Sequence, residues 1–299
     1  MSADRNSIER QFNKSAAESY DRHALVQRDM AGQLASSLAD WKPAAHTAGS
    51  IEVLEIGCGT GSLTEMLLHA RPDFRITAVD IAQAMVDMAG LRIESAGYAG
   101  RARFLRANAE EWAGDQPEAS YDLIVSSACF QWLADPRKTA VELRRLLRPG
   151  GLLAFATFGP ATFHELHESF AAAHRMYGTE PERHGLSFLP ATDWTELLEH
   201  AGFSRIRSGQ ALHTETHAGV RAFLHSVKAA GAGASAASSR GLGYRRLLTA
   251  MFQQYERRYA VPGGISATYE LLFIHGETHA YPDVKLGGPP CLSPRNLGQ

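Results

Sequence analysis

A glycine-rich segment with an acidic neighbour is the part of this sequence best suited to bind a ligand. An apolar run at residues 51–56 leads into Glu55, Gly57, Cys58, Gly59 and Gly61. Glycine lets the backbone approach a ligand closely, and the first N–H groups of a following helix have no partner within that helix. The third glycine comes too early for a dinucleotide fingerprint, and no Lys-Ser/Thr pair follows as in a P-loop. Glu55 would repel a pyrophosphate but attract an amino group, which favours a ligand with an amino-acid moiety.

The elements that must position these residues alternate between strands and helices. We expect strands at 51–56, 75–79, 102–106, 121–126 and 152–158, and helices at 62–68, 82–95 and 139–147, with a turn at 148–151. This alternation predicts an α/β fold whose parallel sheet is covered on both faces. Open parallel sheets bind ligands beyond the carboxyl ends of their strands, where Glu55 and Asp80 would both lie.

The flanking regions follow a different pattern. Residues 1–45 are expected to form a helical arm, and a domain at 46–280 follows it. Past Gly159-Pro160 we expect helices at 162–176, at 193–200 with Asp193 as N-cap, at 218–229 and at 247–259, and strands at 204–214 and 268–274. Small residues at 229–239 indicate a mobile loop, and residues 281–299 a disordered tail.

Composition excludes several classes of protein. In 299 residues, 30 Lys plus Arg stand against 32 Asp plus Glu, so no strong field favours nucleic acid or a membrane surface as partner. The three cysteines show no C-x-x-C pair, and we expect neither a disulfide framework nor a metal site. With no signal peptide and no long apolar stretch, we expect a cytoplasmic protein.

The string E-x-G-x-G-x-G after an apolar strand resembles the first motif of class I methyltransferases that use S-adenosylmethionine. The resemblance implies a Rossmann-like, seven-stranded, mostly parallel sheet with an antiparallel last strand and helical lid insertions. It implies that Asp80 accepts hydrogen bonds from both ribose hydroxyls, as two carboxylate oxygens can. The remaining residues expected near the cofactor are Ile81 and Met85 as adenine walls, Asn108, Ala109 and Glu110 at the adenine edge, and Ser126 at the end of the fourth strand.

Longer strings resemble a narrower family, the malonyl-acyl-carrier-protein O-methyltransferases of the biotin pathway. They are residues 12–20, 129–132, 156–166 (A-T-F-G-P-A-T-F-H-E-L), 227–232, 240–242 and 267–270 (A-T-Y-E). The implied reaction transfers a methyl group to the free carboxylate of a malonyl thioester on acyl carrier protein, and the methyl ester primes pimeloyl synthesis. A carboxyl with a pKa near about 4 is ionised at pH 7, so no general base and no metal are needed.

The acceptor requires residues that orient it and exclude water. We expect Tyr20 and Gln27 to cover the cofactor, and lid insertions at about 160–190 and 217–260 to cover the acceptor. Candidates for positioning the acceptor are Tyr20, Gln131, Trp132, Lys228 and Arg240. Other basic residues stand at Arg144, Arg145 and Arg148 and at Arg245 and Arg246, and each alone is more commonly a solvated surface charge. Cys129 is better explained as a small buried hydrophobe than as a nucleophile.

Three other functions stay open on the sequence alone. A methyltransferase for a small free carboxylic acid, such as an aconitate-like molecule, would need no docking surface for a carrier protein. Methylation of another acceptor atom, as in quinones, is less favoured. A regulator that binds S-adenosylmethionine without turnover would keep the same motifs, and methyl transfer to any acceptor would exclude it.

Overall fold

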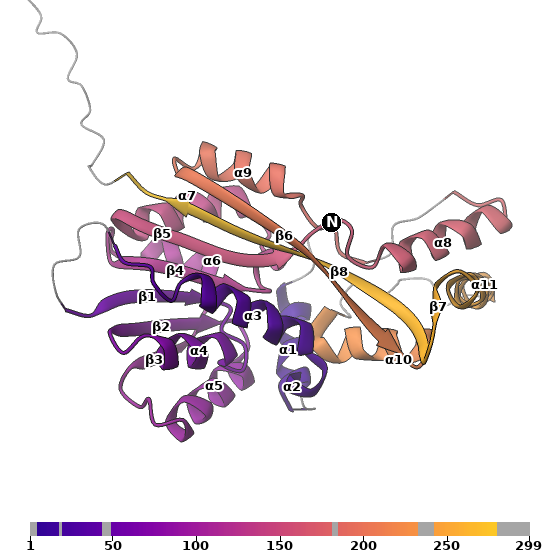
Figure 1. The fold of residues 1–299 in the computed structure, drawn as a ribbon, viewed down its shortest axis with the longest axis horizontal. Coiled ribbons are helices and arrows are strands. Elements are labelled where there is room, and N and C mark those ends of the chain that lie inside the picture. Colours follow the sequence, from indigo (N-terminus) through magenta and orange to yellow (C-terminus); the bar gives the residue numbers. More distant parts are fainter. Residues whose placement is uncertain (1–4, 18–19, 44–48, 181–184, 233–241, 280–299) are drawn as a thin grey trace, which may run out of the picture.

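A single mixed sheet forms the centre of the computed structural model, which describes residues 5–17, 20–43, 49–180, 185–232 and 242–279. Its strand order is β3-β2-β1-β4-β5-β8-β6, with a short β7 paired to β8 (Figure 1). The strands are β1 Ile51–Ile56, β2 Phe74–Asp80, β3 Ala102–Arg106, β4 Tyr121–Ser127, β5 Leu147–Phe158, β6 Ser204–His217, β7 Ala260–Val261 and β8 Gly264–Glu277. Neighbours from β3 to β5 are parallel, whereas β8 is antiparallel to β5 and β6. The predicted seven-stranded sheet with an antiparallel last strand is confirmed.

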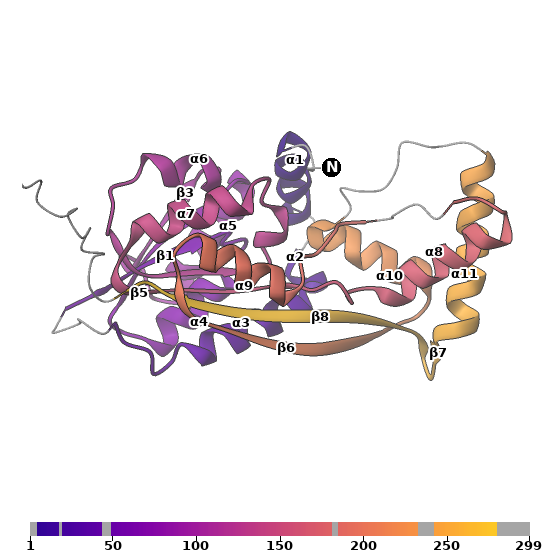
Figure 2. The same cartoon turned by 90° about the horizontal axis from the view of Figure 1, so that it is seen from above.

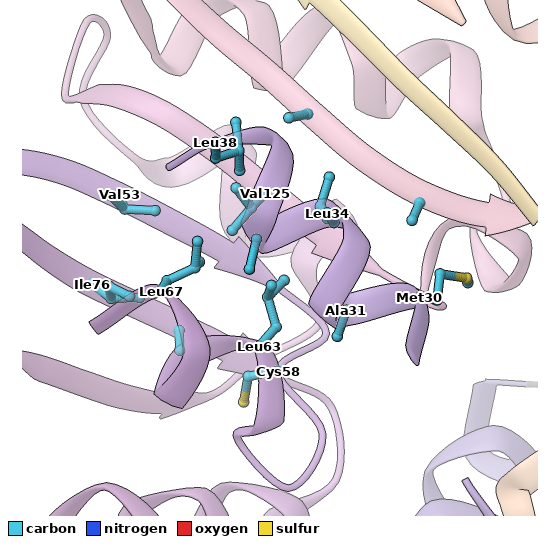
Figure 3. Packing of buried hydrophobic residues seen from close by; sticks show 14 of the residues in the cluster. Met30, Ala31, Leu34, Leu38, Val53, Cys58, Leu63, Leu67, Ile76 and Val125 are labelled. Atoms are coloured by element: carbon cyan, nitrogen blue, oxygen red, sulfur yellow. The ribbon is translucent and has the colours of Figure 1, made fainter. Parts of the chain in front are cut away.

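Helices cover both faces of this sheet because its central strands are apolar on both sides. Helices α3 (Leu25–Ser37), α4 (Ser62–Ala70) and α5 (Gln83–Ser95) contribute to the core on one face. Figure 3 shows Leu34 of α3, Leu38 directly after that helix and Leu67 of α4 in one cluster with Val53 of β1 and Val125 of β4. Helices α6 (Ala109–Trp112), α7 (Pro136–Leu146) and α9 (Ala191–His200) contribute to the core on the other face.

The amino-terminal helices lie at the carboxyl edge of the strands. Helix α1 (Arg5–Ala17) packs against α5, and the short α2 (Tyr20–His23) leads into α3. Asn13 accepts a hydrogen bond from the backbone N–H of Ala84 through Oδ1 at 3.0 Å, and Glu9 pairs with Arg106 at 2.6 Å. These contacts hold the arm against the second and third strand-helix units of the sheet.

A second lobe lies beyond the end of the sheet (Figure 2). Its helices are α8 (His164–Met176), α10 (Val220–Val227), the π-helical turn η3 (Lys228–Ala232) and α11 (Leu242–Tyr259). They enclose a separate apolar cluster that includes Phe170, Phe223 and Tyr255. Strand β8 pairs with β5 from Leu271 to Glu277, whereas its pairing with β6 continues to Ile265 and carries the sheet into this lobe. The insertions at 160–190 and 217–260 therefore pack largely against each other.

Two local predictions are wrong. The turn expected at 148–151 belongs to β5, because Thr278 bonds to both the N–H and the carbonyl of Gly151 and so prolongs the strand pairing. Asp193 does not cap α9, which begins after Pro190, so this carboxylate lies in the first turn instead. The disordered tail expected at 281–299 and most of the loop expected at 229–239 lie outside the described residues. In the described ranges no helix combines the length and apolarity needed to cross a membrane.

Candidate active site

The glycine loop between β1 and α4 adopts a conformation that its glycines make possible. Gly57 has φ +71°, and a Cβ there would lie 2.4 Å from the Sγ of Cys129. Gly61 has φ +83°, and a Cβ there would meet Ala89 of α5 at 3.0 Å. The N–H groups of Gly57 and Cys58 donate to the carbonyl of Val79 at 2.8 and 3.1 Å. The loop is therefore pressed against β2 and against the segment after β4.

Asp80, the last residue of β2, connects this loop to the next helix. Its Oδ2 accepts from the N–H of Gly59 and its Oδ1 from the N–H of Ala82, each at 2.9 Å. Burial raises the pKa of Asp80, and these backbone donors oppose the rise. The N–H of Ile81 also opposes the rise, and with four lone pairs on its two oxygens the carboxylate keeps capacity for a ligand. The structure thus presents two acceptors side by side at the end of β2.

Glu55 is an acidic group buried at the end of β1, with 1% of its surface exposed. Its Oε2 accepts a hydrogen bond from Thr64 Oγ1 of α4 at 2.5 Å. Burial, and to a smaller extent the charge of Asp80, raise the pKa of Glu55 to about 8, while the Thr64 hydroxyl opposes the change. In the described region no cationic side chain pairs with Glu55. A cationic group of a ligand would supply the missing countercharge.

Two adjoining cavities share Gly57 and Gly59 at this edge of the sheet. The first, here called the α1 cavity, lies on the side of α1 and is bounded by Phe12, Asp80 and Trp132 among others. The second, the α3 cavity, lies on the side of α2 and α3 and is bounded by Tyr20 and Glu55 among others. Together they form one cleft that follows the glycine loop at the place where a ligand was expected.

The α1 cavity gathers every residue expected around an adenosine. They come from β2, from the start of α5 and from the segment after β3: Asp80, Ile81, Met85, Asn108, Ala109 and Glu110 all line it. The sequence did not single out Ile8 and Phe12 of α1 for this role, although they line the same cavity. Phe12 meets Trp132 edge to face, with ring centroids 5.6 Å apart. The helical periodicity of residues 8–20 was the available signal for these two residues.

Two polar residues of this cavity, Asn108 and Glu110, also form hydrogen bonds that stabilise the local backbone. Asn108 caps α6, because its Oδ1 accepts from the N–H of Glu110 at 3.1 Å. Glu110 accepts from the backbone N–H groups of Ala134 and Asp135 at 3.2 and 2.8 Å. Its carboxylate therefore fixes the segment between β4 and α7, and the oxygen of Asn108 has one lone pair left for a ligand.

The α3 cavity contains Tyr20, Gln27, Glu55 and Cys58, as expected, together with residues that sequence reasoning missed. The missed residues are Asp21, Arg28, Thr60, Ser62, Arg92 and Ser127. Thr60 Oγ1 donates to Asp21 at 2.7 Å, and Arg92 pairs with the same carboxylate. These bonds fasten the arm to the glycine loop directly over the cleft. Burial and the nearby charges of Asp80 and Asp21 raise the pKa of Tyr20, so its phenol stays neutral.

Other candidates are placed outside these cavities. Ser126 is fully buried, and its hydroxyl donates to the carbonyl of Ile56 at 2.8 Å, so it joins β4 to β1. Gln131 bonds to the carbonyl of Ala128 at 2.7 Å and accepts from Thr157 at 3.1 Å, which fixes the loop after β4. Lys228 is exposed on η3, an element that packs against α1 and α2. Arg240 lies outside the described residues.

The other basic residues that the sequence analysis named also lie away from the cleft. Arg144 and Arg145 bond to backbone carbonyls, including that of Gly202, and Arg148 pairs with Asp122 at 2.6 Å. Arg245 and Arg246 are exposed on α11, at the far end of the molecule from the glycine loop (Figure 1).

The two most selective strings of the sequence, residues 156–166 and 267–270, bind each other. Glu165 accepts from the N–H and hydroxyl of Thr268 at 3.1 and 2.5 Å. Glu270 accepts from the N–H of Ala161 at 2.6 Å, and its carboxylate leaves no room for a Cβ at Gly159. We name this cluster the clasp. It holds the point where the chain leaves β5 for α8 against β8, and so it fixes the second lobe to the sheet.

Cys58 and Cys129 are the cysteines that the structure describes, and neither is activated. Burial raises the pKa of Cys129 to about 12 and that of Cys58 well above its usual range, so both stay as thiols. Throughout the part of the chain that the structure describes, His, Cys, Asp and Glu form no group of three placed to hold a metal ion.

Comparisons with known proteins agree with this geometry. A methyltransferase domain family matches residues 26–207. The malonyl-[acyl-carrier protein] O-methyltransferases of Paenibacillus sp. (strain JDR-2) and Brevibacillus brevis are 49% and 43% identical to this chain, over 92% and 90% of it and over 99% and 95% of their own lengths. A putative methyltransferase from Bacillus halodurans C-125 has the same fold, with a TM-score of 0.57 at 15% identity, covering 83% of this chain and 98% of that one. The chain therefore belongs to the malonyl-[acyl-carrier protein] O-methyltransferase family of S-adenosylmethionine-dependent methyltransferases.

Proposed function

We propose that this protein transfers a methyl group from S-adenosylmethionine to the free carboxylate of a malonyl thioester carried by acyl carrier protein. The observation that carries the proposal is the 49% identity, across nearly the whole chain, to a relative named for this reaction. The cleft supports it, because buried Glu55 and partly buried Asp80 stand at the ends of adjacent strands on either side of one glycine loop. The methyl ester would prime pimeloyl synthesis for biotin.

We further propose how the cleft divides between parts of the cofactor. Glu55 faces the α3 cavity and would pair with the cofactor ammonium, which supplies the countercharge this carboxyl lacks. Asp80 faces the α1 cavity and would accept from the two ribose hydroxyls. Ile81 and Met85 would wall the adenine, and the Asn108–Glu110 segment would run along its edge. This division places the transferable methyl group near Gly57 and Gly59, where the cavities meet.

Methyl transfer to a carboxylate requires that the two reactants be aligned and that water be excluded, and it requires no proton transfer. S-adenosylmethionine, when bound, supplies a methyl group on a positive sulfur, and a malonyl carboxylate oxygen can take it with no proton to remove. Orienting two reactants can supply about 7 to 11 kcal/mol of the barrier. Tyr20 and Phe12 on the arm would exclude water, and the neutral phenol of Tyr20 would offer a hydrogen-bond donor. Trp132 lines the α1 cavity, and its ring would suit the positive sulfur.

The carrier protein is the partner that this proposal requires. Its phosphopantetheine arm would have to reach the cleft past the amino-terminal arm or past the second lobe. Lys228 on η3 is exposed beside α1 and α2, so it would meet an acidic carrier near that entrance. Charge reversal of Lys228 should lower turnover of the carrier substrate and leave cofactor affinity unchanged. Equal turnover by the charge-reversed and native proteins would remove Lys228 from the interface.

The experiment that tests the proposal is intact-mass analysis of malonyl-acyl carrier protein after incubation with this protein and S-adenosylmethionine. Acetyl-acyl carrier protein serves as the control, because it has the same carrier and thioester but no free carboxylate. A gain of one methyl on the malonyl carrier alone supports the proposal. A gain only on free malonate or on an aconitate-like acid would replace it with the small-acid methyltransferase. Saturable cofactor binding with no methylated product would favour a non-catalytic regulator.

A further inference from the structure

Helix α10 presents a row of basic side chains on its outer side. Arg221, His225 and Lys228 follow one another at intervals of four and three residues, which places them along one face of α10 and of its continuation η3. All three are exposed, whereas Val220 and Phe223 are buried in the core of the second lobe. No acidic residue occurs in residues 220–232. The outer side of this helix is therefore positively charged.

The amino-terminal arm extends this charge across the seam between the arm and the second lobe. Helix α2 lies beside α10 in both views (Figure 1, Figure 2), and η3 packs against α1 and α2. The rings of His23 and His225 meet across the seam, with centroids 5.8 Å apart. Arg22 is exposed next to His23, and among the described residues no carboxylate pairs with it. We call the surface formed by Arg22, Arg221, His225 and Lys228 the seam face.

The acidic residues of the arm beside this face already have partners. Asp21 accepts from Thr60 and pairs with Arg92, and Asp29 Oδ2 lies 3.7 Å from His213 Nδ1. The whole chain has a formal charge of -2, so the positive charge of the seam face is a local feature. An exposed patch of one sign attracts a partner of the opposite sign and speeds its association. The seam face therefore suits an acidic macromolecule.

The seam face also borders the cleft. Tyr20 and Asp21 line the α3 cavity, and Arg22 follows them on the same short helix. Leu25, the first residue of α3, is 58% exposed and comes three residues after Arg22. Protein interfaces surround apolar contacts of this kind with a polar rim. A partner bound to the seam face would therefore lie where a flexible group attached to it could enter the cleft along α2.

We propose that the seam face is the docking surface for an acidic carrier protein, which binds the arm and the second lobe at the same time. The proposal rests on the proposed function, in which the carrier delivers a malonyl group on a flexible phosphopantetheine arm. The seam face would hold the acidic surface of the carrier, and the phosphopantetheine would run beside α2 into the α3 cavity. Because α2 and α10 both contribute cations, docking requires both sides of the seam.

The test measures binding of acyl carrier protein that has its phosphopantetheine but no malonyl group, so it does not depend on methyl transfer. Arg22→Glu reverses a charge on the arm, Lys228→Glu reverses one on the lobe, and the double variant reverses both. Arg221 stays unchanged, because its guanidinium lies over the ring of Phe252 and supports the packing of the lobe. The matched control is Arg103→Glu, an exposed arginine of β3 at the opposite edge of the sheet from β6.

The main readout is the dissociation constant for the carrier at low and at high salt. The dissociation constant for S-adenosylhomocysteine and the midpoint of thermal unfolding show that each variant keeps its cleft and its fold. Each single reversal should weaken carrier binding by about three- to fivefold, and the double reversal by about tenfold or more. High salt should shrink these differences, because it screens exposed charges.

Three results would overturn the proposal. Native affinity in either single variant would reject docking across the seam, as would an equal loss in Arg103→Glu. A loss confined to the carrier with its phosphopantetheine, and absent for the carrier without it, would assign the face to the phosphate of that group. Loss of binding to anionic phospholipid vesicles, with carrier binding unchanged, would assign the face to a membrane. If the native protein binds the carrier through the seam face but methylates none of its malonyl form, the docking surface stands and the proposed function fails.

Discussion

The protein should release a proton when it binds its cofactor, and replacing Glu55 by glutamine should abolish this release. Glu55 has a pKa of about 8 in the empty cleft, against an ordinary value of 4.5, so the carboxyl is almost entirely protonated at pH 6.5. A ligand ammonium paired with it favours the ionised form. Binding of S-adenosylhomocysteine at pH 6.5 should therefore release about one proton, and affinity should rise about tenfold per pH unit until pH approaches 8.

The same shift predicts an effect on stability with a definite sign. Because the folded-state pKa of Glu55 is raised, the folded protein holds more protons than the unfolded chain between pH 4.5 and 8. The free energy of unfolding of the empty protein should then fall as pH rises through this window. At 1.36 kcal/mol per unit, the whole shift corresponds to about 5 kcal/mol as an upper limit. Glu55→Gln should remove this slope, so the empty variant should gain stability over the native protein as pH increases.

The assay is isothermal titration calorimetry in two buffers that differ in ionisation enthalpy, which counts released protons directly. Native protein should release about one proton at pH 6.5 and Glu55→Gln none, with weaker binding in the variant. Urea unfolding of both empty proteins at pH 5, 7 and 9 gives the stability arm. A native proton count near zero, or the same count in Glu55→Gln, would refute the pairing of Glu55 with an ammonium.

Three further predictions concern the rest of the cleft and its supports. Asp80→Ala should weaken S-adenosylhomocysteine binding by roughly 100-fold in calorimetry, since two acceptors for hydroxyl groups are lost, and a native-like constant would reject its proposed ribose contact. Gly159→Ala should lower the free energy of unfolding in urea by about 2 to 4 kcal/mol, because its Cβ would overlap the carboxyl of Glu270. An unchanged urea midpoint would show that the Glu270 side chain moves aside at little cost. Asp21→Asn should raise the dissociation rate of S-adenosylhomocysteine several-fold in stopped-flow fluorescence, because the arm loses its salt bridge to Arg92. The free energy of unfolding should barely change. An unaltered dissociation rate would mean that the arm does not control release of the ligand.

The sheet and the cofactor half of the cleft could be predicted because their signals are local in sequence. Apolar runs define β1, β2 and β4, and the glycines after Glu55 need positive φ angles that other residues rarely adopt. Once the strands are parallel, Glu55 and Asp80 must share one edge. Burial patterns along the strands followed from the same runs of apolar residues.

The parts that escaped prediction depend on contacts between distant segments. In the sequence Arg28 resembles any exposed helical arginine. Only the fold places it beside the glycine loop, where the neighbouring Arg92 is paired with Asp21. Ser126 and Ser127 are adjacent and identical in type, so only the strand pleat decides which hydroxyl meets Ile56 and which faces the cavity. The strings around Glu165 and Thr268 identified the family, but their mutual bonding needed both segments in space.

The measurement that most directly tests the central claim is tandem mass spectrometry of the product formed from malonyl-acyl carrier protein and methyl-labelled S-adenosylmethionine. The pantetheine fragment ejected from the carrier should contain the label on the malonyl group, and mild alkali should remove it as methanol, as expected for an ester. A label that stays on the carrier polypeptide, or on a group stable to alkali, would contradict carboxyl methylation of the malonyl thioester.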